Sequence, residues 1–234
     1  MRTAIVLTNY KRPWNMAPMI EQCLASVRRP EIYLVENAEN AENAEAALDS
    51  HAFPFDRVTC LRSGDNLGPG YRFEIVAALP HDVVGCIDDD LILTAAQIDA
   101  LFRQFEIEPQ RLHGVWGERF HRNGRDIVAK RGIRGVEAEV DVLNRAYFLS
   151  PSQARVGSRL AASVGYPRWR DVRVGSDIIA SYAALMAPMC HDVGPLRDCP
   201  TSNDPSIAVW RQSGFYERRA AILASLMARD RPGS

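Results

Sequence analysis

The stretch Val83 to Asp90, VVGCIDDD, is an apolar run that ends in three aspartates. A short apolar run of this kind predicts a buried strand from Val83 to Ile87. Three adjacent carboxylates repel one another and are costly to desolvate, so their place at a strand end indicates a compensating cation. Successive side chains of a strand point to opposite faces, so we expect Asp88 and Asp90 to point the same way.

The residues before this stretch alternate strand and helix patterns, which is typical of an α/β fold with a parallel sheet. The earlier strands are predicted at 4–7, 32–35 and 58–61. Helices are predicted up to Val27, stopped by Pro30, and from Arg72 to Leu79. Ligands of such sheets bind outside the carboxyl ends of the strands. The candidate segments at those ends are 8–12, 36–37, 62–72 and 88–90.

The aspartates favour a hard divalent ion. No pair of cysteines or histidines lies near them in sequence, so Mg²⁺ or Mn²⁺ fits best. These ions typically take one or two carboxylates and complete their shell with phosphate and water, which predicts a nucleotide diphosphate site. Thr94 and Gln97 have the spacing of a capping box, so the aspartates are not needed as helix caps. The alternative is an acidic, solvated turn.

The second half combines short strands with helices. Strands are predicted at 114–116, 127–129, 136–143 and 146–149, and a capping box of Ser150 and Gln153 opens a helix. One later helix carries an apolar face that extends to Met186, and a last helix is predicted from Asp204-Pro205 toward Met227. Lys130, Arg131 and Arg134, between Ile127 and Gly135, predict either a solvated turn, or a mobile lid or a contact with an anionic acceptor group.

Composition narrows the class of protein. The chain has 234 residues, 47% of them hydrophobic, and we expect one compact domain. A formal net charge of -1 gives no basic footprint for nucleic acid or an anionic membrane. Five scattered cysteines fit reduced thiols in the cytoplasm, and no stretch is long and apolar enough for a transmembrane segment.

Several motifs together resemble glycosyltransferases of the GT-A fold. They are Thr8-Asn9-Tyr10-Lys11-Arg12-Pro13, Asn66-Leu67-Gly68 and Asp88-Asp89-Asp90, the last of which looks like the DxD motif. Ser176-Asp177-Ile178-Ile179-Ala180 and Ala208-Val209-Trp210-Arg211, with Arg219 and Leu226 downstream, are similar to the exostosin-like (GT64) transferases. That family usually shows paired acids at Ser176-Asp177, and a His and Arg at Arg211-Gln212.

The resemblance implies one GT-A domain over residues 1–234. Residues 1–93 would form a nucleotide-sugar-binding half with a Rossmann-like sheet, and 94–234 an acceptor-binding half with a smaller mixed sheet. Asp90 would be the main ligand of Mn²⁺ or Mg²⁺, with Asp88 as its companion, while Asp89 would face the ribose or the sugar of the donor. The nucleotide would be lined by Thr8, Tyr10, Arg12, Asn37, Asn66 and Arg72, besides Asp88 and Asp89.

The resemblance also assigns the chemistry. Asp177 would lie beneath the reacting sugar, and Arg211 would reach the diphosphate. Asp177 begins a helix, whose dipole stabilises an ionised carboxylate that suits a base or a charge stabiliser. The enzyme would be a hexosyltransferase (EC 2.4) that transfers sugar from a UDP-linked donor to a hydroxyl acceptor such as a glycan, with retention. The alternatives are a nucleotidyltransferase and a non-catalytic sugar-nucleotide or glycan-binding module.

Overall fold

The structure, a computed structural model, describes residues 1–36, 57–63, 65–123, 126–199, 202, 209–211 and 213–228. The Asn-Ala-Glu repeat at 37–45, expected to form an exposed helix, and the candidate Asn37 lie outside the described residues.

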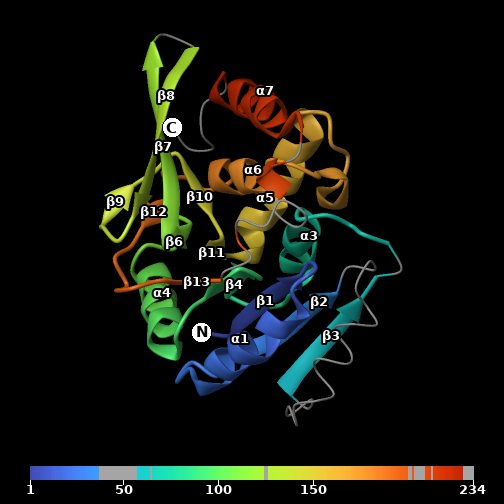
Figure 1. Ribbon diagram of the computed structural model, residues 1–234, viewed down its shortest axis with the longest axis vertical. Helices are drawn as coiled ribbons and strands as arrows, with labels where there is room; N and C mark the ends of the chain where they lie inside the picture. The colour runs from blue at the N-terminus through green and yellow to red at the C-terminus, as the bar shows by residue number, and fades with distance from the viewer. Residues whose placement is uncertain are drawn as a thin grey trace.

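An eight-stranded sheet forms the centre of the described fold, in the order β3-β2-β1-β4-β11-β6-β12-β9 (Figure 1). The four predicted amino-terminal strands are confirmed, and they are parallel to one another. The bounds are β1 Thr3–Asn9, β2 Glu31–Glu36, β3 Val58–Arg62, β4 Val83–Asp88, β6 His113–Gly114, β9 Ala138–Glu139, β11 Ala146–Leu149 and β12 Met189–Cys190.

The register of the two central strands brings candidate residues together. Thr8 of β1 lies directly opposite Asp88 of β4, and both are at the carboxyl ends of their strands. On the other side of β4, β11 runs antiparallel and pairs Ala146 with Ile87. The sheet therefore presents the end of β1 and the start of the Asp triplet at one edge.

Helices cover both faces of the sheet, and β1 shows why. Its residues alternate: Ile5 and Leu7 pack with α1 and α4, whereas Ala4 and Val6 pack with α3 and α5. Because successive strand residues point to opposite faces, an unbroken apolar run can fill two cores at once. The helices span α1 Pro13–Ala25, α3 Tyr71–Ala78, α4 Ala95–Ile107 and α5 Pro151–Ser163.

Both predicted capping boxes are present. Thr94 and Gln97 cap α4 reciprocally, and Ser150 and Gln153 do the same for α5. Helix α1 ends at Ala25, so Val27, which we placed on its apolar stripe, is 79% exposed.

The second half contains a smaller sheet of three antiparallel strands, in the order β10-β7-β8. β7 (Trp116–Asn123) and β8 (Asp126–Arg134) form a hairpin that projects beyond the central sheet (Figure 1). The strand predicted at 127–129 and the basic loop after it are therefore one strand, whose ladder pairs Lys130 with Phe120 and Arg134 with Trp116. β10 spans Val142–Asn144, and β5 (Leu91–Ile92) pairs with β13 (Arg197–Asp198).

The carboxy-terminal helices differ from prediction in their bounds. α6 (Ser176–Tyr182) ends before Leu185 and Met186, which are exposed and not part of an apolar helix face. The last helix, α7, spans Phe215–Met227 and follows Gly214, whose φ of 71° is in the left-handed region. The predicted start, Asp204-Pro205, lies outside the described residues, and Val209–Arg211 form a 3-10 turn separate from α7.

Two glycines allow Trp169 to join the halves. Its indole is 1% exposed and packs on Phe73 of α3, with ring centroids 4.9 Å apart. A Cβ at Gly70 would collide with the carbonyl oxygen of Trp169, and a Cβ at Gly157 of α5 would collide with its ring. Both glycines are thus required by close packing, and the loop before α3 rests on the second half of the chain.

The first prediction tests this packing. Alanine normally stabilises a helix relative to glycine by about 0.5–1 kcal/mol, but overpacking a core costs about 1–3 kcal/mol. We expect Gly157→Ala to lower the free energy of unfolding in urea, because the second effect is larger. Ser158→Ala, on the same helix, is the control and should change it little. A stabilised Gly157→Ala protein would contradict the tight fit around Trp169.

Candidate active site

A pocket of about 600 Å³ opens at the carboxyl ends of β1 and β4. Its walls come from both halves of the chain, including the loop before α3, the β7–β8 hairpin, α6 and α7. The lining residues are Thr8, Tyr10, Arg12, Asn66, Gly68, Pro69, Arg72, Asp88 to Asp90, Trp116, Glu118, Lys130, Asn144, Arg145, Tyr147, Arg173 to Asp177, Ser202, Trp210, Phe215, Tyr216 and Arg219.

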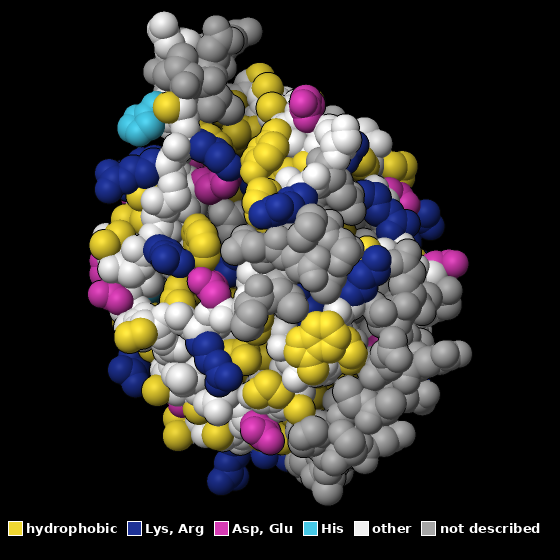
Figure 2. Space-filling model, viewed as in Figure 1, with side chains coloured by type: hydrophobic (Ala, Val, Ile, Leu, Met, Phe, Trp, Pro, Cys, Tyr) yellow, Lys and Arg dark blue, Asp and Glu magenta, His cyan; other side chains and the backbone are white. Residues whose placement is uncertain are grey.

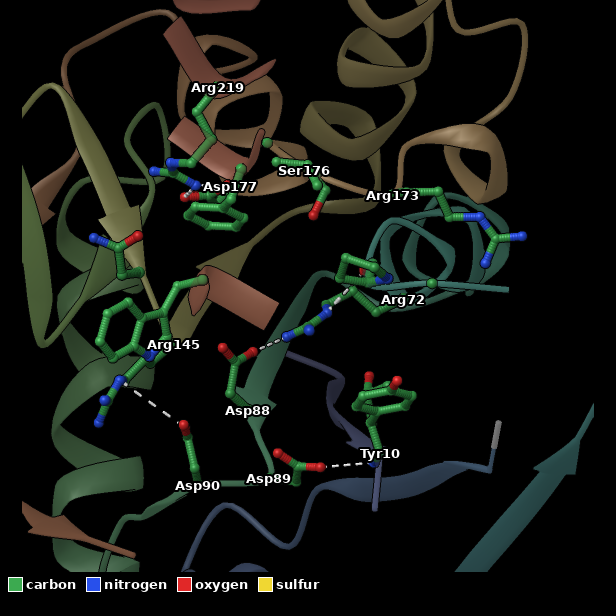
Figure 3. A pocket seen from close by; sticks show the side chains of 18 of the residues that line it. Tyr10, Arg72, Asp88, Asp89, Asp90, Arg145, Arg173, Ser176, Asp177 and Arg219 are labelled. Atoms are coloured by element: carbon green, nitrogen blue, oxygen red, sulfur yellow. Dashed lines mark hydrogen bonds and ion pairs between the residues drawn. The ribbon is translucent and has the colours of Figure 1, made fainter. Parts of the chain in front are cut away.

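The three aspartates diverge. β4 ends at Asp88, and the next two residues form a turn, so the strand period of two no longer applies. In Figure 3 the carboxylate of Asp88 points toward Arg72, that of Asp89 toward Tyr10 and that of Asp90 toward Arg145. Each aspartate therefore has its own environment.

Asp88 is paired with Arg72. The guanidinium of Arg72 makes a short contact with Oδ1 of Asp88, and its Nε donates to the carbonyl oxygen of Pro69 at 3.0 Å. Arg72 is 8% exposed, whereas the side chain of Asp88 is 27% exposed toward the pocket. Burial acts to lower the pKa of Arg72, but the adjacent Asp88 holds it above its usual value.

The carboxylate of Asp89 contacts neighbouring groups of the protein. Arg12 Nη1 lies 2.6 Å from its Oδ1, and the backbone N–H of Tyr10 donates to Oδ2 at 2.6 Å. Asn15 of α1 donates to its carbonyl oxygen at 2.7 Å. Burial raises the pKa of Asp89, and Arg12 and the Tyr10 N–H oppose that rise. In the described structure this carboxylate fastens the end of β1 to the end of β4, and Asp89 also lines the pocket.

The carboxylate of Asp90 has the weakest contacts of the three. Its Oδ1 is buried and has no hydrogen-bond partner among the described residues, and Arg145 Nε is 3.9 Å away. Burial and the neighbouring charge of Asp88 raise its pKa. A buried carboxylate oxygen without a partner is costly, so it is a fitting ligand atom for a cation. No cluster of three or more His, Cys, Asp or Glu side chains suited to a metal occurs in the described part of the chain.

Arg145 was missed by the sequence analysis. It has a φ of 64°, which is uncommon for a residue other than glycine and often marks a functional site. Its backbone carbonyl accepts the N–H of Asp88 at 2.7 Å, and its guanidinium lies 4.3 Å from the ring centre of Trp116. It also pairs with Asp198. A residue in a turn between two short strands carries no periodic signal that would identify it.

Asp177 lies across the pocket from the triplet (Figure 3). It is the second residue of α6, which begins at Ser176, and both of its carboxylate oxygens contact Nη1 of Arg219, at 2.7 and 2.6 Å. Nη2 of Arg219 contacts Glu118 at 3.3 Å, and Lys130 contacts the same Glu118 at 2.9 Å. An ion-pair chain therefore runs from the hairpin through α7 to α6.

The pocket gathers most of the candidate residues but not all. Arg211 is exposed, lies 4.8 Å over the ring of Trp210 and is not among the pocket-lining residues. Arg219 of α7, eight residues after Arg211, provides the guanidinium next to Asp177. Trp210 is 39% exposed and lines the pocket. The candidates found in the lining are Thr8, Tyr10, Arg12, Asn66, Arg72, Asp88, Asp89, Asp90 and Asp177.

The histidines considered as further metal ligands lie elsewhere. His113 of β6 contacts His191 at 2.8 Å, and His191 contacts Glu137 at 2.7 Å. Neither histidine is among the residues that line the pocket.

The described part of the chain contains no helix with the length and hydropathy of a membrane span.

Comparison with known proteins gives a family and a fold. The sequence pattern described as "Glycosyl transferase family 2" matches residues 4–156. This stretch contains the whole Asp triplet and ends before Asp177. No curated protein matches the chain in sequence.

Two solved structures illustrate the similarity of fold. GalNAc-T7 with UDP, GalNAc and Mn²⁺ has a TM-score of 0.60 at 10% identity, over 85% of this chain and 44% of that one. TarS of S. aureus in complex with UDP has a TM-score of 0.53 at 11% identity, over 84% and 59%. The chain thus spans less than two thirds of each. The expected likeness to exostosin-like transferases is not confirmed by these comparisons.

The second prediction separates two neighbouring aspartates. Asp89→Asn leaves the buried Arg12 without its counter-charge, so we expect the free energy of unfolding to fall by about 3 kcal/mol. Asp90→Asn removes a buried carboxylate that lacks a hydrogen-bond partner in the described structure, so stability should stay the same or rise. Urea unfolding of the two variants beside the wild type measures the difference. Equal losses would contradict the separate roles.

Proposed function

The chain belongs to glycosyl transferase family 2 and is a glycosyltransferase of GT-A fold, and on this basis we propose which donor and which residues it uses. The donor is a nucleoside diphosphate sugar, UDP-linked, and the sugar passes to a hydroxyl acceptor such as a glycan. The observation that carries this proposal is the pocket at the ends of β1 and β4, which has the Asp triplet on one wall and Asp177 on the other.

The donor's nucleotide is proposed to lie at the amino-terminal wall. Thr8 lines the pocket there, and its hydroxyl has no hydrogen-bond partner among the described residues. The loop 65–70 forms the adjacent side, where Arg173 contacts the carbonyl oxygen of Asn66. Two similar folds were solved with UDP, and this supports the choice of uridine. Asn37 would follow β2 beside this wall, and it stays a proposal from sequence.

A divalent ion, Mn²⁺ or Mg²⁺, is proposed at Asp88 and Asp90. The residues fit such an ion, because Oδ1 of Asp90 is buried without a hydrogen-bond partner in the described part and Asp88 is open to the pocket. When bound, the ion would neutralise charge on the departing diphosphate. Arg72 contacts only Oδ1 of Asp88, so the same carboxylate can hold Arg72 and the ion together. The guanidinium of Arg72 would then also lie close enough to meet a phosphate of the donor.

Asp177 is proposed to act on the reacting sugar. It is 8% exposed, lines the pocket and is held by Arg219 through both oxygens. A carboxylate fixed in this way can accept the proton of the acceptor hydroxyl or stabilise positive charge at the anomeric carbon. Net retention is proposed on the exostosin likeness alone, and NMR of the anomeric centre in the first-formed product decides it. Arg211 keeps its proposed contact with the diphosphate only if it moves into the pocket.

The third prediction concerns donor and ion together. Because the aspartates and the diphosphate would share one ion, UDP should raise the thermal midpoint much more with Mn²⁺ than with EDTA. A hundredfold excess of UDP over its dissociation constant corresponds to about 2.7 kcal/mol of stabilisation. Asp90→Asn should lose the Mn²⁺-dependent part and stay folded. An equal shift in EDTA would remove the proposed ion from the donor site.

The fourth prediction concerns Asp177. Asp177→Asn keeps the size of the side chain and removes its charge, so we expect kcat of sugar transfer, or of donor hydrolysis, to fall by roughly 10² to 10⁴. Affinity for UDP should hardly change, because Asp177 lies across the pocket from the nucleotide wall. Asp171→Asn is the control, since Asp171 pairs with Arg168 outside the pocket. Wild-type turnover, or a collapse of UDP affinity, would contradict this role.

A further inference from the structure

The β7–β8 hairpin has one face that continues the pocket wall. Side chains directly opposite each other share a face, so Trp116, Glu118 and Lys130 lie on the same side as Gly132 and Arg134. Trp116, Glu118 and Lys130 line the pocket. We call the surface formed by Lys130, Gly132 and Arg134 the platform. It leads from the pocket along a hairpin that projects from the molecule (Figure 1).

Gly132 is not explained by the fold. It lies inside strand β8, where glycine weakens the strand because it has no side chain to pack. Its φ is not positive, and a Cβ added there would meet only Nε1 of Trp116, at 3.9 Å. By contrast, the glycines at 70 and 157 are forced by close contacts. A strand glycine with open space above it is typical of a surface that something approaches closely.

The hairpin is also strongly basic. Residues 116–134 contain six Lys or Arg and two acidic residues, in a chain whose formal net charge is -1. Lys and Arg side chains lie along its side of the molecule (Figure 2). On the opposite face, Arg119 lies directly across from Arg131, and like charges at such positions cost stability. The sequence thus keeps positive charge here at a cost to the fold.

The cations of the platform have partners that can be exchanged. Lys130 contacts Glu118, and Arg134 contacts Asp198 at 3.4 Å. The side chains of Lys130 and Arg134 are 45% and 57% exposed, and ion pairs this exposed contribute about 0–1 kcal/mol. Lys130 also lies 5.0 Å over the ring of Tyr216, and Arg134 5.0 Å over the ring of Trp116. A phosphate or carboxylate that binds both cations replaces their ion pairs, and Glu118, directly opposite Gly132, keeps Arg219 as its partner.

We propose that the platform binds the acceptor, and that this acceptor carries a phosphate or carboxylate group that sits over Gly132 between Lys130 and Arg134. This inference rests on the proposed transferase function and names the acceptor class. The donor wall lies at the ends of β1 and β4, so the hairpin is free for the second substrate. An acceptor seated here extends toward Asp177, because Glu118 and Arg219 connect the platform to that residue.

Binding of simple probes tests the proposal with the whole chain and UDP present. The probes are tetragalacturonate for carboxylate, mannose 6-phosphate for phosphate, and maltotetraose as the neutral match, each measured by calorimetry. We expect one or both anionic probes to bind at least tenfold more tightly than maltotetraose, and to weaken as salt rises. Equal affinities, or no binding by either anionic probe at millimolar concentration, would overturn the proposal.

Variants on the two faces of the hairpin test which face binds the anionic probe. Gly132→Val should weaken the anionic probe roughly tenfold or more, while thermal stability is unchanged or higher because β-branched residues suit a strand. Ala129→Val makes a similar change on the opposite, exposed face and should leave binding unchanged. The double variant Lys130→Gln/Arg134→Gln should remove the preference for charge, whereas Arg131→Gln should keep it. Binding unaffected by Gly132→Val, or lost equally in Arg131→Gln, would overturn the proposal.

Two further readouts separate this inference from its premise. UDP binding should be unchanged in all of these variants; if the wild type does not bind UDP, the proposed function fails and not the platform alone. Sedimentation with phosphatidylglycerol vesicles tests a membrane as the partner. Vesicle binding that depends equally on Lys130 and Arg131 would show a membrane-facing surface and would overturn the acceptor assignment.

Discussion

The described structure depends on how three adjacent carboxylates are compensated at the end of a buried strand. Each residue of Asp88–Asp90 has an arginine from a different element: Arg72 from α3, Arg12 from the loop after β1, and Arg145 from the turn between β10 and β11. Asp89 is buried, and its charge would be too costly without Arg12. The contact of Asp90 is the weakest, at 3.9 Å, and leaves its Oδ1 without a hydrogen bond in the described part. The triplet thus brings three distant segments to one point, which is the floor of the pocket.

The same requirement joins the two halves of the chain. Arg145 accepts the N–H of Asp88 through its backbone and faces Asp90 with its side chain, so the second half completes the end of β4. The loop before α3 is likewise held from the second half, by Trp169 under Gly70. Residue 93 is therefore not a boundary between two structural units, because the eight-stranded sheet takes strands from both sides of it.

Features with a local physical cause could be predicted from the sequence. Buried parallel strands are apolar along their whole length, and capping boxes are closed within four residues, so β1 to β4 and the starts of α4 and α5 were found. Features set by distant partners could not. The basic stretch of β8 looks like a turn until its pairing with β7 is known. The direction of Asp89 follows from a turn and from Arg12, neither of which the strand period contains.

Asp177 and the platform are connected, yet the contacts indicate that they can be changed separately. Arg219 meets both oxygens of Asp177 at 2.6 to 2.7 Å but reaches Glu118 only at 3.3 Å, and Lys130 is one contact further away. The orientation of Asp177 is therefore set within the buried pair of α6 and α7, and the exposed end of the chain of ion pairs adds little to it. On the proposed assignment, changes on the hairpin should act on acceptor affinity and leave the rate of the chemical step to Asp177. Acceptor preference could then change on one hairpin, because the proposed donor wall and Asp177 belong to other elements.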